Sequence, residues 1–276
     1  MWTLIKLIIL RKSLILFAAA LMISWASMAQ NVETLDVSME KNGPFSTQVG
    51  EYLIEGKVLN GLKEGTWYEY HANKHLLHRM IQFEKGKKNG AYLEVDETGA
   101  LVKKAEYSDD EYDGVVYTWY RGGKLSNKST YRKGVMDGEQ IQCYDQGGNK
   151  EIANYKNGLR DGMTTWFDQG GNKVMTIEYK EGRFEGKQET FYKTGGVKTL
   201  KTFKNNIQEG PAIEYYEGGS IQSECNYKGG KVSGNVKHYK DMKPYVEERA
   251  KEQGVKDIKE IKKEFKQEMK KEVKKE

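Results

Sequence analysis

Proline is scarce in this sequence, with three residues against 30 glycines. Tyrosine and tryptophan are frequent by comparison, at 18 and 5 residues. Aromatic residues favour β-strands, and glycine supplies the positive φ angles that tight turns need. Charged residues make up 31% of the chain, which leaves too little apolar surface for a thick multilayer core. The composition therefore predicts many short strands joined by glycine turns.

The chain also lacks an apolar run long enough to span a membrane as a helix. Its longest run, SLILFAAALMISWA at residues 13–26, is shorter than the ~20 residues that a spanning helix needs. Basic residues without any acid precede this run, and SMA at residues 27–29 follows it. This order is typical of a secretory signal peptide over residues 1–29, cleaved between Ala29 and Gln30, with an uncleaved anchor as the alternative. We therefore expect an exported protein, either periplasmic or extracellular.

The chain also has no strong excess of positive or negative charge. The formal net charge is +5, and the basic residues of the signal peptide, Lys6, Arg11 and Lys12, account for three of those charges. The remaining chain is at +2, without the basic patch that attracts nucleic acid. We therefore expect no nucleic-acid partner.

One short phrase recurs along the chain. It reads YRKGVMDG at residues 131–138, YKNGLRDG at 155–162 and YKEGRFEG at 179–186. The last glycine of the phrase, called the repeat glycine, is taken as position 0, and its spacing is 25 residues once and 24 residues thereafter. The repeat glycines are Gly65, Gly90, Gly114, Gly138, Gly162, Gly186, Gly210 and Gly234. Such regularity predicts an array of stacked units, each burying surface against its neighbours.

Each unit has the sequence pattern of a β-hairpin. An aromatic residue usually stands at positions −7 and +5, and Gly, Asn or Asp stands at position −4, where a tight turn needs a left-handed backbone. A second turn, such as Gly122-Gly123 or Gly218-Gly219, separates two segments with strand character. The pattern predicts strand, turn, strand and turn in every repeat.

Counting outward from a two-residue turn gives the register of each hairpin. A repeat glycine then lies opposite an aromatic residue 17 positions later, whose ring could lie over the glycine backbone where no side chain stands. The predicted pairs are Gly114 with Tyr131, Gly186 with Phe203 and Gly210 with Tyr227. Gly138 and Tyr155, and Gly162 and Tyr179, stand at the same repeat positions, and the count leaves the register of these two hairpins open. Turn chemistry alone is the alternative interpretation of these glycines. A one-residue shift near the turns of the Gly138 and Gly162 hairpins predicts a bulge in those two.

The residue before the repeat glycine is acidic in six of the eight units. One carboxylate per repeat, ~10 Å from the next, is too few for the six to eight oxygens of a calcium site. We therefore expect these acids to accept hydrogen bonds from turn amides. They are Glu64, Asp113, Asp137, Asp161, Glu185 and Glu209.

Potential metal ligands are few. Three of the four histidines, His71, His75 and His78, fall in the turn region of the first repeat without a cysteine or a carboxylate cluster, so a solvated turn is favoured over a zinc site. Cys143 and Cys225 are more than three repeats apart, ~30 Å at two strands per repeat, which exceeds the reach of a disulfide. We expect two free, mostly buried thiols, and neither a metal nor a cofactor.

The repeats predict an all-β fold, an elongated and twisted antiparallel sheet of about eight hairpin repeats of 24 residues. Residues 30–64 precede the array and contain a degenerate hairpin, and the array covers residues 65–240. In residues 241–276, apolar residues at every third or fourth position predict a charged amphipathic helix. That helix either frays in solvent, covers the last strand or binds a partner.

The pattern Y-x-x-G-x-x-[DE]-G, followed by an aromatic pair and Gly-Gly, resembles the MORN repeat variant of bacterial proteins, in the group labelled YwqK-like antitoxins. The resemblance covers residues 50–239 in eight copies. It implies an antiparallel array of hairpins that serves as a scaffold or binding surface. The antitoxin label implies a cytoplasmic partner. A resemblance to classical MORN proteins implies association with phospholipid.

No nucleophile elbow, phosphate-binding loop or Ser/His/Asp constellation occurs in the sequence, so we expect a protein that is not an enzyme. Tyrosines at position +6 follow the aromatic residue at +5 and are predicted to point to the opposite face of the sheet. They either form a binding surface or pack across strands for stability. They are Tyr120, Tyr144, Tyr192 and Tyr216. The functional hypothesis is an exported scaffold that binds a protein or a glycan along its sheet, with membrane-surface association and antitoxin-like partner binding as alternatives.

Overall fold

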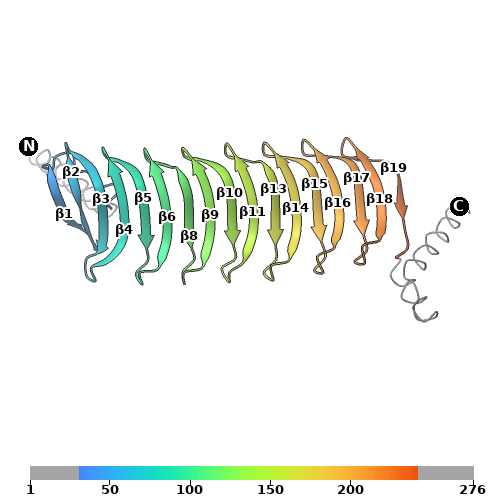
Figure 1. Cartoon of the computed structure of the whole chain (residues 1–276), viewed down its shortest axis with the longest axis horizontal. Helices are drawn as coiled ribbons and strands as arrows, with labels where there is room; N and C mark the ends of the chain where they lie inside the picture. Colours follow the sequence, from blue (N-terminus) through green and yellow to red (C-terminus); the bar gives the residue numbers. More distant parts are fainter. Residues whose placement is uncertain (1–30, 242–276) are drawn as a thin grey trace, which may run out of the picture. The chain divides into compact units, whose positions relative to one another are not determined.

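The computed structural model describes residues 31–241 (Figure 1). These residues form β-strands and turns, and the strands pair antiparallel, which confirms the predicted all-β class. No helix among them is long and apolar enough to cross a bilayer. The predicted signal peptide and its cleavage site at Ala29 and Gln30 lie outside the described residues and stay predictions. The helix predicted in residues 241–276 also stays a prediction, because all of that segment after Asp241 lies outside the described residues.

The chain divides into two compact units, Met1–Val135 and Met136–Glu276, called the first and the second unit. In the first unit each strand pairs with its neighbour in sequence, and β6 pairs with both parts of the interrupted strand that follows it. The strands are β1 (Gly43–Val49), β2 (Tyr52–Leu59), β3 (Leu62–His71), β4 (Leu76–Glu84), β5 (Lys87–Val95), β6 (Leu101–Ser108), β7 (Glu111–Tyr112), β8 (Gly114–Trp119) and β9 (Leu125–Arg132).

The second unit repeats this arrangement. Its strands again pair in chain order, and β11 pairs with both parts of an interrupted strand. They are β10 (Val135–Cys143), β11 (Asn149–Lys156), β12 (Leu159–Arg160), β13 (Gly162–Phe167), β14 (Lys173–Lys180), β15 (Arg183–Phe191), β16 (Val197–Lys204), β17 (Ile207–Tyr215), β18 (Ile221–Lys228) and β19 (Lys231–His238). The pattern of strand, turn, strand and turn is confirmed in both units.

The register of the hairpins is the one that the sequence predicts. All three predicted pairs of a repeat glycine with a later aromatic residue are observed, including Gly210 with Tyr227, and Gly138 and Gly162 pair with Tyr155 and Tyr179 in the same way. Near the turn the register shifts by one residue in every one of these hairpins, so the bulge predicted for only two of them is general. The loop closes with a left-handed glycine, such as Gly219 at φ +85°, which is the geometry that produces a bulge.

The repeat glycines are required by the backbone, and the predicted contact of a ring with the glycine backbone stays a prediction. All eight have positive φ, for example +71° at Gly65 and +126° at Gly114, a conformation that L-residues rarely adopt. A Cβ at Gly210 would meet only the Cβ of Thr202, at 3.8 Å, and a Cβ at Gly65 would meet nothing within 4 Å. The paired ring of Tyr227 therefore lies more than 4 Å from the position that a Cβ of Gly210 would take.

Apolar burial differs between the two units. The first unit has a core cluster that includes Val32, Trp67 and Ile81, each with 0% of its surface exposed. In the described part of the second unit, the buried apolar side chains are Cys143, Ala153 and Ile177. Since the repeats have the same pattern, something outside the repeats must account for the difference.

Candidate binding surface

Residues at positions −7 and −2 pair across neighbouring strands and form a row along the sheet of each unit, called the ring row. In the first unit the pairs are Val58 with Lys63, Phe83 with Lys88 and Tyr107 with Tyr112. In the second unit they are Tyr155 with Arg160, Tyr179 with Phe184, Phe203 with Gln208 and Tyr227 with Val232. Because directly paired residues share a face, the row presents aromatic rings interleaved with cationic and polar side chains.

Residues 31–42, called the strap, cover the ring row of the first unit. Val32 and Val37 of the strap belong to the same buried cluster as Val58, Phe83 and Tyr107. Those three row residues are only 0%, 5% and 8% exposed. The additional core of the first unit therefore depends on a segment that carries no repeat.

Polar contacts fix the backbone of the strap. Val32 donates its N–H to the fully buried Glu69 carboxylate at 2.7 Å. The Lys63 ammonium donates to the carbonyl oxygens of Val32, at 2.6 Å, and Glu33, at 2.9 Å. The Glu33 carboxylate pairs with Lys88 at 3.0 Å. The strap is thus bound as an aliphatic and acidic peptide, with every charge of this contact partnered.

Burial lowers the pKa of Lys63 from its ordinary 10.5 to about 8, and the charges of Glu33 and Asp36 act in the opposite direction. Glu69 has further side-chain partners. Arg79 donates to Glu69 at 3.2 Å and to Glu94 at 3.3 Å, and His78 lies 3.7 Å from Glu69. These groups anchor the carboxylate that holds the strap.

The ring row of the second unit has no strap over it among the described residues. Its aromatic members are half-buried, in contrast to Phe83 and Tyr107 of the first unit. Tyr179 and Phe184 meet edge to face with centroids 5.1 Å apart, and Phe184 and Phe203 at 5.7 Å. The arrangement is favourable for aromatic pairs and leaves part of each ring accessible.

Arg160 organises one end of this row. Its guanidinium lies 5.6 Å from the Tyr155 ring and 5.5 Å from the Tyr179 ring, and it pairs with the Glu151 carboxylate. It also donates to Thr164 Oγ1 at 3.2 Å. The second oxygen of Glu151 accepts the indole N–H of Trp166 at 2.9 Å. The guanidinium is thereby held in a fixed position with a quarter of its side chain exposed, at 25%.

The tyrosines at position +6 begin turns, and their hydroxyls bond to the neighbouring hairpin. Tyr144 donates to the carbonyl of Phe167 at 2.7 Å, Tyr192 to that of Tyr215 at 2.7 Å and Tyr216 to that of Tyr239 at 2.9 Å. Tyr120 also begins a turn, with its N–H bonded to the Lys124 carbonyl at 2.8 Å. These contacts support the structural interpretation of the +6 position, and its use as a binding surface stays a prediction.

Four of the six acids at position −1 cap turns, as the sequence predicts. Their carboxylates accept a backbone N–H from the turn of the following hairpin. The observed bonds are Lys85 N–H to Glu64, Glu181 N–H to Asp161, Asn205 N–H to Glu185 and Gly229 N–H to Glu209, at 2.9, 3.2, 2.7 and 2.6 Å. Each acid therefore ties one hairpin to the next.

Two predictions on the rarer residues have different outcomes. Cys143 and Cys225 are free thiols, as predicted, with Cys143 buried and Cys225 half-buried. The prediction of a solvated turn is wrong for His71 and His78, which are half-buried in β3 and β4 with their rings 5.0 Å apart and both beside Tyr52. No group of three metal-ligating side chains occurs in residues 31–241.

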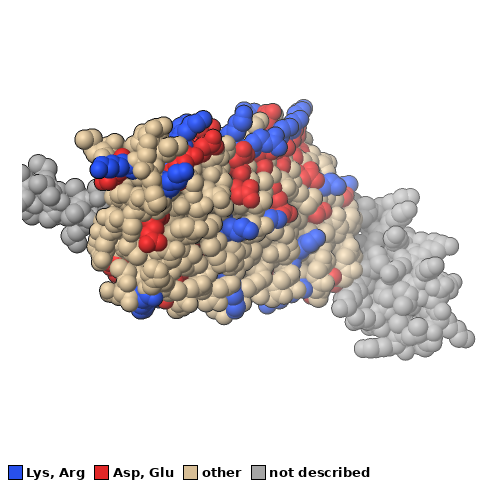
Figure 2. Space-filling view, turned by 60° about the vertical axis from the view of Figure 1, so that its left-hand side comes forward, with Lys and Arg blue, Asp and Glu red and all other residues tan. Residues whose placement is uncertain are grey.

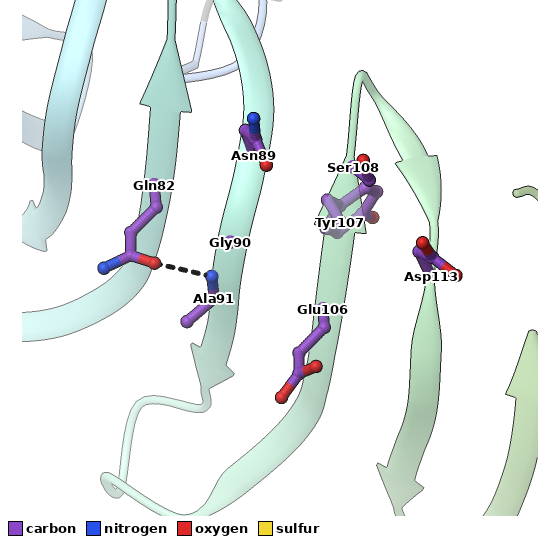
Figure 3. Close-up of a pocket in the computed structure, with 8 residues that line it drawn as sticks. All are labelled: Gln82, Asn89, Gly90, Ala91, Glu106, Tyr107, Ser108 and Asp113. Carbon is purple, nitrogen blue, oxygen red and sulfur yellow. Dashed lines mark hydrogen bonds between the residues drawn. The ribbon is translucent and has the colours of Figure 1, made fainter. Parts of the chain in front are cut away.

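A pocket of the first unit lies where β4, β5 and β6 adjoin (Figure 3). Gln82 Oε1 accepts the N–H of Ala91 at 2.8 Å and so satisfies the backbone beside the repeat glycine Gly90. Figure 3 shows Glu106 and Asp113 pointing in different directions, so these two carboxylates do not converge on one point. The Gln82 side chain in this pocket thus stabilises the irregular backbone beside the repeat glycine Gly90.

The family model described as MORN repeat variant matches residues 112–133, 184–205 and 208–228. Each matched segment begins at position −2 of a repeat or beside it and contains the aromatic residue at the end of the same hairpin. No curated protein matches the chain.

Proposed function

We propose that this protein is an exported, non-enzymatic repeat scaffold that binds a protein partner along the ring row of its second unit. The observation that carries the proposal is the contrast between the two units. Phe83 and Tyr107 are buried beneath the strap in the first unit, and the aromatic residues at the same repeat positions are half-buried, with rings accessible, in the second. A surface built to be covered in one unit is available for a partner in the other.

The chemistry of the row supports protein binding. Tyrosine and arginine are enriched at the energetic centres of interfaces because they combine large contact areas with fixed polar groups. Arg160 is already oriented by Glu151 and Thr164, so little side-chain entropy is lost when it meets a partner. Among the described residues, the segment that covers a ring row is the strap, and the strap is itself a stretch of peptide.

A glycan would also stack on exposed rings and is the second candidate for the same surface. A membrane surface receives less support. Figure 2 shows acidic and basic side chains adjoining one another on the face drawn, without a broad basic area that anionic lipid would attract. Export is supported by the sequence pattern of residues 1–29 alone.

Site-specific photo-crosslinking tests the proposal. A benzophenone amino acid in place of Phe203 stands in the ring row, and one in place of Leu200 stands on the opposite face of the same strand, β16. We expect protein adducts from position 203 and none from position 200 when the producing cells are irradiated. Adducts from position 200 alone, or equal adducts from both, would refute the row as the binding face.

Two parallel assays separate the other candidates. Pelleting of the purified chain with anionic liposomes at low salt would favour the membrane alternative. Binding to a glycan array that is lost in Phe203→Ser would replace the protein partner by a glycan on the same surface.

A further inference from the structure

The two units place different groups at position −2 of the ring row. In the first unit this position supplies Lys63 and Lys88, the two cations that hold the strap. In the second unit it supplies Arg160 and Gln208. Arg160 therefore occupies the repeat position that binds the acidic peptide segment in the first unit.

Arg160 retains hydrogen-bonding capacity toward a ligand. A guanidinium has five N–H donors, and the bonds to Glu151 and Thr164 leave donors directed elsewhere. The Tyr155 and Tyr179 rings flank it and provide apolar surface for an aliphatic side chain. A carboxylate beside a valine or leucine would meet a charged partner and a ring at the same place.

Gln208 provides the second polar contact. Its Nε2 is buried and has no hydrogen-bond partner among the described residues. A buried donor left unpaired is costly, and a carbonyl of a bound peptide would satisfy it, as Val32 and Glu33 carbonyls do for Lys63. Arg160 and Gln208 are two repeats apart, roughly 19 Å at four strand spacings, which about six residues of extended peptide would span.

We propose that the ring row of the second unit binds an extended peptide segment in which an aliphatic residue is followed by an acidic one, the chemistry of the strap. The acidic side chain pairs with Arg160, the aliphatic side chain packs on Tyr155 and Tyr179, and a carbonyl farther along accepts from Gln208. This inference rests on the proposed function, because it specifies the partner of the same surface.

The probe is a fluorescent peptide of the strap sequence, NVETLDVSMEKN, titrated with the purified full chain and followed by anisotropy. We expect saturable binding that Arg160→Gln weakens about tenfold or more and Arg160→Lys partly restores, because a buried charge pair is lost and regained. The matched control is Arg183→Gln, since Arg183 is exposed and stands at position −3, on the other face. A peptide with lysine in place of Glu33 and Asp36 should not bind.

A second variant guards against misfolding, because Arg160 also contributes to packing. Gln208→Ala lies outside the Glu151 network and should weaken binding about threefold or more while the circular dichroism spectrum is unchanged. Equal binding by Arg160→Gln and the original chain, or by the charge-reversed peptide, would overturn the proposal. Loss of binding in Lys88→Gln and not in Arg160→Gln would also overturn it, because the probe would then be exchanging with the strap.

The remaining occupants are distinguishable outcomes. Peptide binding that appears only after removal of residues 242–276 would mean that the chain's own segment occupies the row, and the proposal would be wrong. Self-association abolished by Arg160→Gln would assign the row to a second copy, and the proposal would again be wrong. If the photo-crosslinks from position 203 persist and the peptide does not bind, the scaffold function stands and the peptide chemistry fails.

Discussion

The backbone angle φ explains why glycine recurs at position 0 of every repeat. The repeat glycines adopt φ between +71° and +126°, where any other L-residue is strained. At some repeats a side chain from the preceding strand also occupies the space beside the glycine. At Gly186 that side chain is Glu178, whose carboxylate accepts the Lys187 N–H at 3.2 Å. At Gly234 nothing lies within 4 Å of an added Cβ.

We therefore expect Gly186→Ala to destabilise the protein more than Gly234→Ala. Strain alone should cost about 1–2 kcal/mol in Gly234→Ala, and displacement of Glu178 from its hydrogen bond should add about 1 kcal/mol in Gly186→Ala. Urea unfolding of the two variants measures the difference. Equal losses, or a larger loss in Gly234→Ala, would show that the side chain beside the glycine is irrelevant.

Lys63 gives the protein a specific pH dependence. Its pKa of about 8 in the folded protein is below the ordinary 10.5, so the unfolded chain binds more protons between these two values. This group therefore contributes stability that rises as the pH increases from about 8 toward 10.5. A ¹³Cε titration of Lys63 should have its midpoint near 8, and Glu33→Gln should lower it further because the Glu33 charge raises this pKa. A midpoint near 10.5 would contradict the burial of Lys63 beneath the strap.

At the scale of the hairpin, hydrogen bonds from one repeat to the next take the place of a thick core. The hydroxyls of Tyr192 and Tyr216 and the carboxylates of Glu185 and Glu209 each bond to the backbone of the following hairpin. Such contacts couple only nearest neighbours, which is the energetic behaviour expected of a repeat array.

Tyr192→Phe tests this coupling. Removing the hydroxyl bond to the Tyr215 carbonyl should destabilise the protein by about 1 kcal/mol. Tyr215→Phe is the matched control, because the Tyr215 hydroxyl makes no hydrogen bond among the described residues. Thermal unfolding of both variants gives the comparison. If Tyr192→Phe is as stable as its control, the hydrogen bond to the Tyr215 carbonyl does not stabilise the protein.

Periodicity explains which features of the hairpin the sequence could predict. The register of Gly210 with Tyr227 and the capping by Glu185 follow from residues that recur every 24 positions. The orientation of Tyr192 could not be predicted by alternation, because the bulge at the turn interrupts the alternation one residue before it. The positive φ of the repeat glycines could not be predicted by counting register, because a strand pattern alone does not show where the backbone leaves the β region.

At the scale of the molecule, the two units share repeat positions and differ in what covers them. The strap buries the ring row of the first unit, and its sequence has no periodic signal by which it could have been predicted. The one feature of the sequence that indicated a covering segment was position −2, where Lys63 and Lys88 place cations in an otherwise apolar row. A lysine between buried rings indicates a polar segment above it, such as the Val32 and Glu33 carbonyls and the Glu33 carboxylate.

Hydroxyl-radical footprinting of the unmodified protein, with and without its bound partner or the strap peptide, tests the central claim most directly. In the free protein we expect oxidation of Tyr155, Tyr179 and Phe203, and strong protection of Phe83 and Tyr107 beneath the strap. Addition of the partner should protect the first three residues and leave the other two unchanged. Rings of the second unit that are protected in the free protein, or that stay equally reactive in the complex, would contradict the assignment of this row as the binding surface.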